Sequence, residues 1–287
     1  MLRNIGTRRD CVGAPRICAG IRRQLLRFLA SALLVINAAL FGTVSPAAAR
    51  DSCDPRQLAV KLTQFGVPES VRQLVVVTSD SWSSAVGILN KFEFRDGRWC
   101  EVDAAFPVVL GRRGSAWGHG LHNTVGLGPQ KEDGDERVPA GIFRLGPAFG
   151  YDKDLKPVLQ FPYRQATRTD YFVDDDNSTD YNTWVQLPEA ANNPRAHWKS
   201  FEVMRRPDDL YRLGIVIQQN TAPAVRGHGS AIFLHIWRSA TTPTAGGVGL
   251  RESNLRRLID WLAPGATPVL VAAPREALAK LRFKPSQ

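Results

Sequence analysis

The sequence has little cysteine and little histidine, and no cysteine follows Cys100 in a chain of 287 residues. Four cysteines and five histidines are present in all, and no CxxC or paired-histidine spacing accompanies the cysteines. Structural zinc sites need closely spaced thiolate and imidazole ligands. The sequence therefore predicts no metal site, and nothing in it indicates a bound cofactor.

The chain also lacks a run of basic residues outside its first 49 positions. Its formal net charge is +10, but those 49 residues hold seven Arg and one Asp, which leaves 30 basic and 26 acidic residues in the remainder. A nucleic-acid-binding surface requires basic residues clustered together. The composition therefore excludes nucleic acid as the expected partner.

One apolar run stands out, at 28–44, after an Arg-rich start and before the small residues "PAAA" that precede Arg50. This order is typical of a secretory signal peptide over 1–49, cleaved after Ala49. An uncleaved membrane anchor is the alternative, because the run is at the lower limit for spanning a bilayer. We expect an exported protein of the periplasm or cell envelope, with no stable membrane span after cleavage. The general and the twin-arginine export routes both stay open.

Two cysteines remain after the predicted cleavage site, Cys53 and Cys100. An oxidising compartment favours a disulfide between them. Two unrelated thiols are the alternative, since a sequence does not show how closely the two alpha carbons approach.

The region after the signal is dominated by short segments rich in Val, Ile and aromatic residues, which predict strands. They are 73–79, 87–95, 99–111, 212–220 and 230–237. Asp96-Gly97 indicates a tight hairpin turn. Helical patterns are few, at 55–66, 251–263 and 274–283, and the second places Leu255, Leu258, Ile259 and Leu262 on one stripe. We predict a mainly β fold, a twisted sheet or sandwich, in a single domain over 50–287.

Two long irregular stretches, 111–143 and 160–200, join these strands and are rich in Gly, Asp, Asn and aromatic residues. Loops of this length are commonly functional. We expect their aromatic side chains to form the walls of a groove.

Among the five histidines, His235 differs from the others by its position. It ends an apolar strand and precedes the small-residue turn "TPTAGGVGL". His119 and His122, in "WGHGLHN", are interpreted as solvated turn residues, and His197 and His228 carry no signal of their own.

Four motifs in order give this region a family resemblance. "VGLGPQKEDGDERVPAGIFRLGPAFGY", "DYNTW", "YRLGIVIQQN" and "GHGSAIFLHIWRSATTPTAGGVGLRESNLRRLIDWL" together resemble the YkuD-type L,D-transpeptidases, and in particular a branch of exported bacterial proteins. The resemblance covers about 74–268, most of the chain after the signal. It implies a domain that works on the stem peptides of peptidoglycan.

The chemistry that the resemblance implies is acyl transfer through a cysteine thiolate. The thiolate attacks a stem-peptide carbonyl, and a histidine accepts the thiol proton. Carried onto this chain, His235 takes the place of the base and Gly246 lies in the turn that stabilises the oxyanion. Substrate contacts fall on residues that match the other motif positions: Tyr181, Asn182, Trp237, Thr244 and Ala245.

The nucleophile position of the family falls on Gly247. Glycine has no side chain, so no covalent acyl intermediate can form there. Hydroxyl groups lie nearby in the sequence, on Ser239, Thr241, Thr242 and Thr244, but a hydroxyl is a poor nucleophile without an aligned base. A second departure from the branch is Glu136, where the family pattern has glycine.

Three functions therefore remain open at this point. The first is a catalytically impaired envelope protein that binds peptidoglycan stem peptides in the groove. The second is an active L,D-transpeptidase that uses another nucleophile. The third is a structural or protein-interaction module with no ligand in the groove.

Overall fold

The computed structural model describes residues 52–54, 61–123, 126–155, 159–221 and 223–284. The chain divides into two units, Met1–Ser45 and Pro46–Gln287, and every described residue lies in the second. The predicted signal peptide and the first half of the predicted helix at 55–66 lie outside the described residues.

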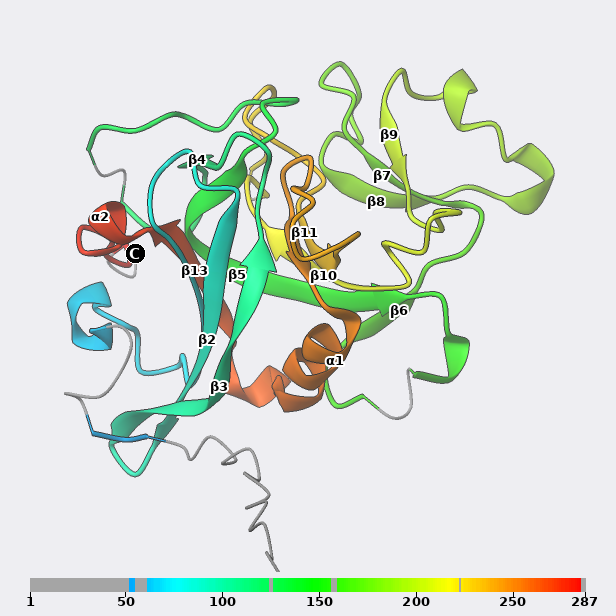
Figure 1. Cartoon of the computed structure of the whole chain (residues 1–287). Helices are drawn as coiled ribbons and strands as arrows, with labels where there is room; N and C mark the ends of the chain where they lie inside the picture. Colours follow the sequence, from blue (N-terminus) through cyan, green and yellow to red (C-terminus); the bar gives the residue numbers. More distant parts are fainter. Residues whose placement is uncertain (1–51, 55–60, 124–125, 156–158, 222, 285–287) are drawn as a thin grey trace, which may run out of the picture. The chain divides into compact units, whose positions relative to one another are not determined.

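Eight strands form a sheet that closes on itself through strand pairing. Its long strands β2, β3 and β5 are seen in Figure 1. The pairing order is β10-β11-β12-β3-β2-β1-β13-β5, and β5 pairs in turn with β10. Short strands β4 and β6 pair with β5. The bounds are β1 (Gln73–Ser79), β2 (Val86–Arg95), β3 (Arg98–Val109), β4 (Ser115–Trp117), β5 (Val138–Gly150), β6 (Tyr163–Gln165), β10 (Leu213–Gln218), β11 (Phe233–Ile236), β12 (Val248–Leu250) and β13 (Val269–Pro274).

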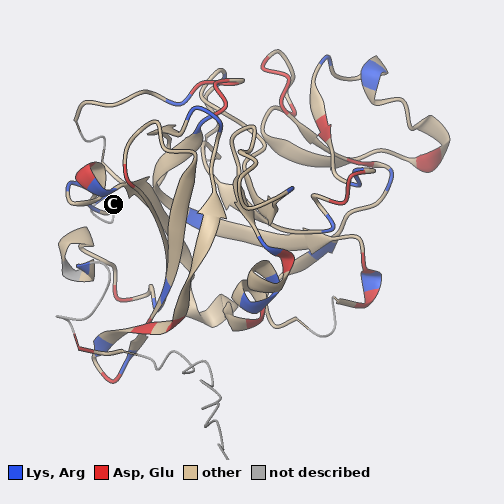
Figure 2. Cartoon of the chain, viewed as in Figure 1, with Lys and Arg blue, Asp and Glu red and all other residues tan. Residues whose placement is uncertain are grey.

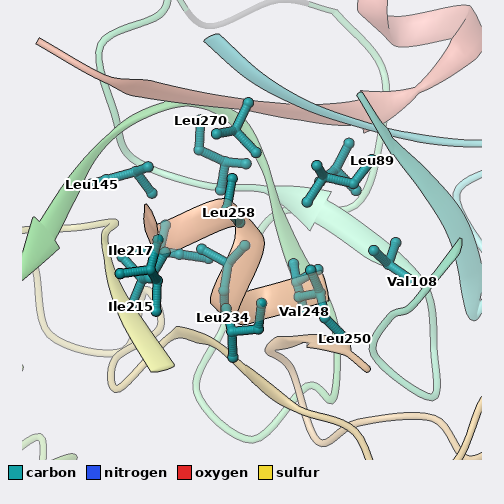
Figure 3. Packing of buried hydrophobic residues seen from close by; sticks show 14 of the residues in the cluster. Leu89, Val108, Leu145, Ile215, Ile217, Leu234, Val248, Leu250, Leu258 and Leu270 are labelled. Carbon is teal, nitrogen blue, oxygen red and sulfur yellow. The ribbon is translucent and has the colours of Figure 1, made fainter. Parts of the chain in front are cut away.

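The main core fills the space inside this sheet (Figure 3). Alternate residues of β10, β11 and β12 point inward, because side chains of a strand alternate between its two faces. Helix α1 (Glu252–Trp261) adds its apolar stripe, and all four stripe residues predicted from the sequence are buried. Leu258 of α1 lies among Leu234, Leu250 and Leu270 in this cluster. Closure of the sheet thus fixes β11 and β12 side by side.

The predicted mainly β fold is confirmed, and the five predicted strands correspond to β1, β2, β3, β10 and β11. The predicted hairpin between β2 and β3 is also confirmed. Asp96 and Gly97 have φ values of 50° and 76°, and two successive positive φ angles are the signature of a type I′ turn.

The interpretation of 111–143 as an irregular stretch was wrong over its last residues. They begin β5, whose 13 residues pair with both β10 and β13. Pro139, Gly141 and Gly146 make this strand resemble a loop in the sequence. In the described half of the predicted helix at 55–66, Leu62–Phe65 is a 3-10 helix. The helix predicted at 274–283 is shorter than expected, since α2 spans only Arg275–Leu278.

The stretch 160–200 is likewise ordered for the most part, and it holds most of a second, three-stranded sheet. Its strands are β7 (Asp170–Val173), β8 (Thr183–Gln186) and β9 (Phe201–Val203), in the order β8-β7-β9. Phe172 of β7 packs edge-to-face on Phe233 of β11, with ring centroids 5.1 Å apart. Aromatic packing therefore attaches this sheet to the strand that carries His235. Short 3-10 turns complete the fold at Lys153–Leu155, Glu189–Ala191, Pro194–Ala196 and Pro264–Ala266.

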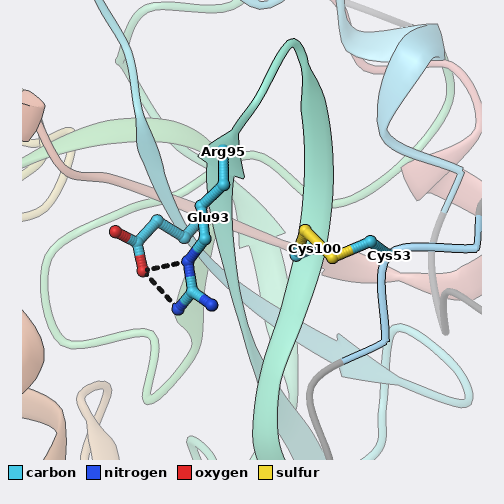
Figure 4. The surroundings of a disulfide bond; sticks show 4 residues. All are labelled: Cys53, Glu93, Arg95 and Cys100. Atoms are coloured by element: carbon cyan, nitrogen blue, oxygen red, sulfur yellow. Dashed lines mark hydrogen bonds and ion pairs between the residues drawn. A yellow bond between two sulfur atoms is a disulfide. The ribbon is translucent and has the colours of Figure 1, made fainter.

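The predicted disulfide between Cys53 and Cys100 is present (Figure 4). The two alpha carbons are 4.0 Å apart, and 47 positions separate the residues in the sequence. Ser52 and Glu101 exchange two backbone hydrogen bonds beside it. The bond therefore fastens the first described residues to the beginning of β3.

Charged side chains of both signs are interspersed over the described elements, without a block of one sign (Figure 2). This distribution agrees with the nearly balanced charge of the chain after its first 49 residues. In the part of the chain that the structure describes, no helix is long and apolar enough to span a membrane.

Candidate active site

His235 lies near the end of β11 with 9% of its surface exposed. Its Nδ1 is 2.9 Å from the carbonyl oxygen of Ile236. Donation from Nδ1–H to this oxygen selects one tautomer and leaves Nε2 as the acceptor. Burial lowers the pKa of His235 to about 4, against a smaller raising effect of the Ile236 carbonyl. The imidazole is therefore neutral at physiological pH, the form that a general base requires.

The turn that follows is fixed by the hydroxyl of Thr244. Thr244 Oγ1 donates to the carbonyl oxygen of Gly247 at 2.6 Å and accepts from the Gly246 N–H at 3.2 Å. Gly246 has φ +145°, a conformation that favours glycine. The Gly246 N–H must therefore give up its hydrogen bond to Thr244 Oγ1 before it can donate to a ligand. Ala245 is exposed at the tip of the turn.

Gly247 and His235 face each other across the two neighbouring parallel strands. A Cβ atom built on Gly247 lies 2.9 Å from His235 Nε2 and 2.7 Å from the carbonyl oxygen of Phe233. The parallel pairing of β11 with β12, Leu234 against Val248, produces this approach. Both separations are shorter than a normal van der Waals contact, so the Phe233 carbonyl and the imidazole would have to shift to admit a side chain at residue 247, which would then lie against the acceptor nitrogen.

A polar network that the sequence did not reveal lies on the other side of His235. Tyr211 packs edge-on against the imidazole, with ring centroids 5.6 Å apart, and its hydroxyl donates to Glu202 at 3.3 Å. Arg206 binds Asp208 through two hydrogen bonds of 2.9 Å and also reaches Glu202 at 3.2 Å. Burial raises the pKa of Glu202. Glu202 lies in β9, and the other three residues come from "RRPDDLY", a segment without any periodic pattern.

Tyr181 lies two positions before β8, and its hydroxyl contacts Asp133 and not His235. Its hydroxyl donates to Asp133 at 2.6 Å, and Ser230 donates to the other oxygen of that carboxylate at 2.8 Å. Burial, followed by the Asp133 carboxylate, raises the pKa of Tyr181. Asp133, the first residue of "DGDERVP", therefore fixes the buried Tyr181 side chain through a hydrogen bond.

Asn182 is buried in the left-handed conformation, with φ 59°. Its amide nitrogen donates to the carbonyl oxygens of Gln219 and Asn220 at 3.0 and 2.7 Å, and its oxygen accepts from the Ala231 N–H at 3.1 Å. All of these partners are backbone groups at the two ends of the loop between β10 and β11. The side chain thus connects that loop to the turn before β8.

Trp237 directly follows β11, and its backbone N–H donates to the carbonyl oxygen of Leu250 at 2.8 Å. Its Cβ lies 3.1 Å from a Cβ built on Gly249. Of the predicted substrate-contact residues, Trp237, Thr244 and Ala245 therefore belong to the strand ends around His235. Tyr181 and Asn182 are linked instead to Ser230 and Ala231, four or five positions before it in the chain.

Glu136 has φ 55°, a backbone conformation that glycine adopts without strain. Its carboxylate pairs with Arg112, whose backbone N–H donates to the carbonyl oxygen of Thr244 at 3.0 Å. Glu136, which replaces the glycine of the family pattern, is therefore accommodated by its ion pair with Arg112, next to Thr244 of the candidate site.

The hydroxyl groups of the preceding segment bond mostly to one another. Ser239 Oγ lies 2.7 Å from Thr242 Oγ1 and 3.3 Å from Thr241 Oγ1. Within the described ranges, no hydroxyl or thiol forms a hydrogen bond with His235. Both cysteines there are joined in the disulfide.

The interpretation of His122 as a solvated turn residue was wrong. Its side chain is 5% exposed, and its Nδ1 accepts a hydrogen bond from the Ile142 N–H at 3.1 Å. His119 instead stacks on His228, with ring centroids 4.6 Å apart. Over the described ranges, no group of three His, Cys, Asp or Glu residues is arranged to hold a metal ion.

The closed β-sheet brings a neutral histidine beside a glycine-rich turn, at the positions where the sequence motifs led us to expect the base and the nucleophile of the family. The family model YkuD, L,D-transpeptidase catalytic domain, matches residues 89–271. The chain belongs to this family. Membership implies an L,D-transpeptidase-like function related to peptidoglycan, and domains of this family are typically exported enzymes of the cell envelope.

Among solved structures, the chain is similar to the helical cell shape determining protein Pgp2 from Campylobacter jejuni. The match has 12% sequence identity and a TM-score of 0.35, and it covers 73% of this chain and 50% of that one. The chain therefore spans about half the length of that structure. A comparison with curated proteins found no match.

Proposed function

We propose that this protein is an exported member of the family that binds peptidoglycan stem peptides and is impaired in acyl transfer. In this proposal residue 247 occupies the nucleophile position, and a glycine there removes the thiolate. His235 and the Thr244 turn form the remainder of the site, with Gly246 as an oxyanion donor. The predicted substrate contacts keep their proposed roles.

The observation that carries the proposal is the approach of residue 247 to His235. A Cβ at this position would lie against His235 Nε2, the ring nitrogen left as the acceptor, once the imidazole and the Phe233 carbonyl shift to admit it. A nucleophile and its base must lie within hydrogen-bond reach of each other. The framework of a nucleophile–base pair is thus supported, and the nucleophilic atom is missing from it.

An active enzyme with another nucleophile is the second candidate. Thr244 supplies a hydroxyl in the turn, but this hydroxyl already donates to the Gly247 carbonyl and accepts from the Gly246 N–H. Ser239 and Thr242 bond to each other. These contacts favour the impaired protein, because none of these hydroxyls is aligned with His235.

Intact-mass spectrometry with a carbapenem-type acylating agent tests the proposal. The unmodified chain without its signal is expected to gain no mass, whereas Gly247→Cys gains one adduct. Adding His235→Asn to Gly247→Cys should slow adduct formation at least tenfold, because the thiolate loses its base. An adduct on the unmodified chain would contradict the proposed impairment.

Gly247→Ala and Gly265→Ala form a matched pair that controls for folding. A methyl group at residue 247 meets the Phe233 carbonyl oxygen at 2.7 Å, while nothing lies within 4 Å of a Cβ at residue 265. Gly247→Ala is expected to cost about 1–3 kcal/mol of stability, as overpacking does, and Gly265→Ala nothing. If Gly247→Cys melts like Gly247→Ala and still gains no adduct, residue 247 is not the nucleophile position.

Binding separates the impaired protein from a structural module. The unmodified chain should sediment with purified peptidoglycan sacculi, and soluble stem tetrapeptide should release it. Sedimentation that the peptide leaves unchanged, or no sedimentation at all, would favour the structural module.

A further inference from the structure

A cavity of about 770 Å³ lies away from the candidate site, and none of the predicted site residues lines it. We call it the Arg144 pocket. It lies over β5, β10 and β13, where Arg144 pairs in register with Gln218 on one side and Val269 on the other. Its volume falls within the range of small-molecule sites.

Arg144 is the exposed residue of β5 and forms part of the pocket lining. It lies in β5, which has a paired strand on both sides, between the buried residues Phe143 and Leu145. The guanidinium has no ion pair or hydrogen bond with any described residue, whereas Lys91, which is buried on another strand of the same sheet, is bonded to Asp103 at 2.6 Å. The guanidinium of this exposed lining residue therefore keeps its donors available to solvent or to a ligand in the pocket.

The lining of the Arg144 pocket carries positive charge without compensation. Lys284 is the second cation, and its Nζ donates only to the carbonyl oxygen of Gly120, at 3.1 Å. No Asp or Glu occurs among the lining residues. A guanidinium fork binds a carboxylate through two parallel hydrogen bonds. The pocket therefore favours an anion, and the geometry of Arg144 suits a carboxylate.

The other lining residues indicate the chemistry of the rest of the ligand that carries this carboxylate. Gln218 lies beside Arg144 on the neighbouring strand, roughly 5 Å away between Cβ atoms, and its amide can pair with a peptide group. Apolar walls come from Val71, Val269 and Phe283. A ligand with an amide next to its carboxylate and with small apolar side chains matches all three features.

One wall of the Arg144 pocket is held rigidly against β5. The Leu121 N–H donates to the carbonyl oxygen of Ile142 at 2.7 Å, and the Ile142 N–H donates to His122 Nδ1 at 3.1 Å. A Cβ on Gly120 would lie 2.2 Å from the same Ile142 oxygen, so only glycine allows this approach. The segment "WGHGLHN" therefore builds the wall, and the pocket is preformed.

We propose that the Arg144 pocket binds the free carboxylate end of a short peptide, at a site separate from His235 and Gly247. Arg144 holds the carboxylate, Gln218 pairs with the adjacent amide, and the apolar walls receive the terminal side chain. The proposal does not depend on the assignment of residue 247.

Isothermal titration calorimetry of the chain without its signal tests this site with three probes at millimolar concentration. They are N-acetyl-D-alanyl-D-alanine, its C-terminal amide and inorganic phosphate. The acid should bind, and the amide should bind at least tenfold more weakly. Equal binding of acid and amide, no binding of the acid, or binding of phosphate alone would each overturn the proposal.

Variants then locate the binding site. Arg144→Gln is expected to weaken binding of the acid at least tenfold, and Arg144→Lys to have an intermediate effect, because an ammonium lacks the fork. Arg98→Gln is the matched control, since it removes the same charge from the exposed tip of the β2–β3 hairpin. Thermal melting checks that each variant folds. Unchanged binding in a folded Arg144→Gln chain would refute the assignment, as would a loss of equal size in Gly247→Ala.

Discussion

At the scale of the residue, the candidate site combines an intact imidazole with an absent side chain. His235 is buried, neutral and oriented by the Ile236 carbonyl, so its Nε2 is available as an acceptor. Gly247 is the residue that this acceptor faces. The close approach of the Phe233 carbonyl indicates that the surrounding backbone is packed for glycine at this position.

Two buried imidazoles predict how stability depends on pH. His122 and His235 each have a pKa lowered by burial to about 4, against 6.5 for an ordinary histidine. The unfolded chain therefore binds more protons between these values, and acidification favours unfolding. Each imidazole should cost up to about 3 kcal/mol as the pH falls from 6.5 to 4, and nothing above 6.5.

Urea unfolding at pH 7, 5.5 and 4 measures this effect. His122→Asn and His235→Asn should each show a shallower loss of stability with acidification than the unmodified chain, whatever their stability at pH 7. The exposed His197→Asn serves as the control and should keep the original slope. Parallel curves for all four proteins would mean that neither imidazole titrates as its burial predicts.

At the scale of the element, parallel pairing of β11 and β12 brings the histidine to the turn, and the loop between β10 and β11 closes the region before it. Asn182 fastens both ends of that loop through three backbone groups. Aromatic contacts such as Phe172 on Phe233 attach the three-stranded sheet to the same strand. The neighbourhood of His235 is thus assembled from elements that are distant in the sequence.

Replacing Asn182 should loosen this assembly. Asn182→Gly keeps the positive φ angle but removes three hydrogen bonds, at a cost of about 3 kcal/mol. Asn182→Ala should cost about 1 kcal/mol more, because alanine resists the left-handed conformation. Denaturant unfolding gives both values. Hydrogen exchange at the Ala231 amide should accelerate in both variants, and an unchanged rate would show that Asn182 does not hold the loop.

At the scale of the whole molecule, a covalent bond joins the first described residues to the closed sheet. The disulfide between Cys53 and Cys100 encloses 47 positions and connects to the beginning of β3. The closed sheet provides the main core, so the bond adds to a fold that already buries its strands. Its formation also agrees with the oxidising compartment in which this family typically works.

Removing the disulfide should lower stability without changing the fold. The loss of a cross-link of this span is expected to cost about 4 kcal/mol at most, mainly by freeing the unfolded chain. A Cys53→Ser, Cys100→Ser double variant should unfold like the reduced protein, and reductant should have no further effect on it. Equal denaturant midpoints for the oxidised and reduced proteins would contradict this expectation.

The sequence alone determined the fold class, five of the eight strands of the closed sheet and the helix stripe, and it favoured the cysteine pair. These features depend on the periodicity of short segments, on turn residues and on the predicted export signal, and each of these can be recognised in a continuous stretch of sequence. Position 247 could be singled out only through the family motifs, because a glycine carries no chemical signal of its own. The segment "WGHGLHN" was misjudged, since burial of His122 arises from contact with β5, twenty positions away.

Only the tertiary structure decided which of these residues meet. Closure of β5 onto β10, the approach of residue 247 to His235 Nε2, and the network of Tyr211, Glu202 and Arg206 all join residues brought together by strand pairing and packing. The Arg144 pocket has the same origin, because its cations and apolar walls come from separate strands and loops. The residues that make such contacts are far apart in the sequence and form no periodic pattern, because the packing of the whole chain brings them together.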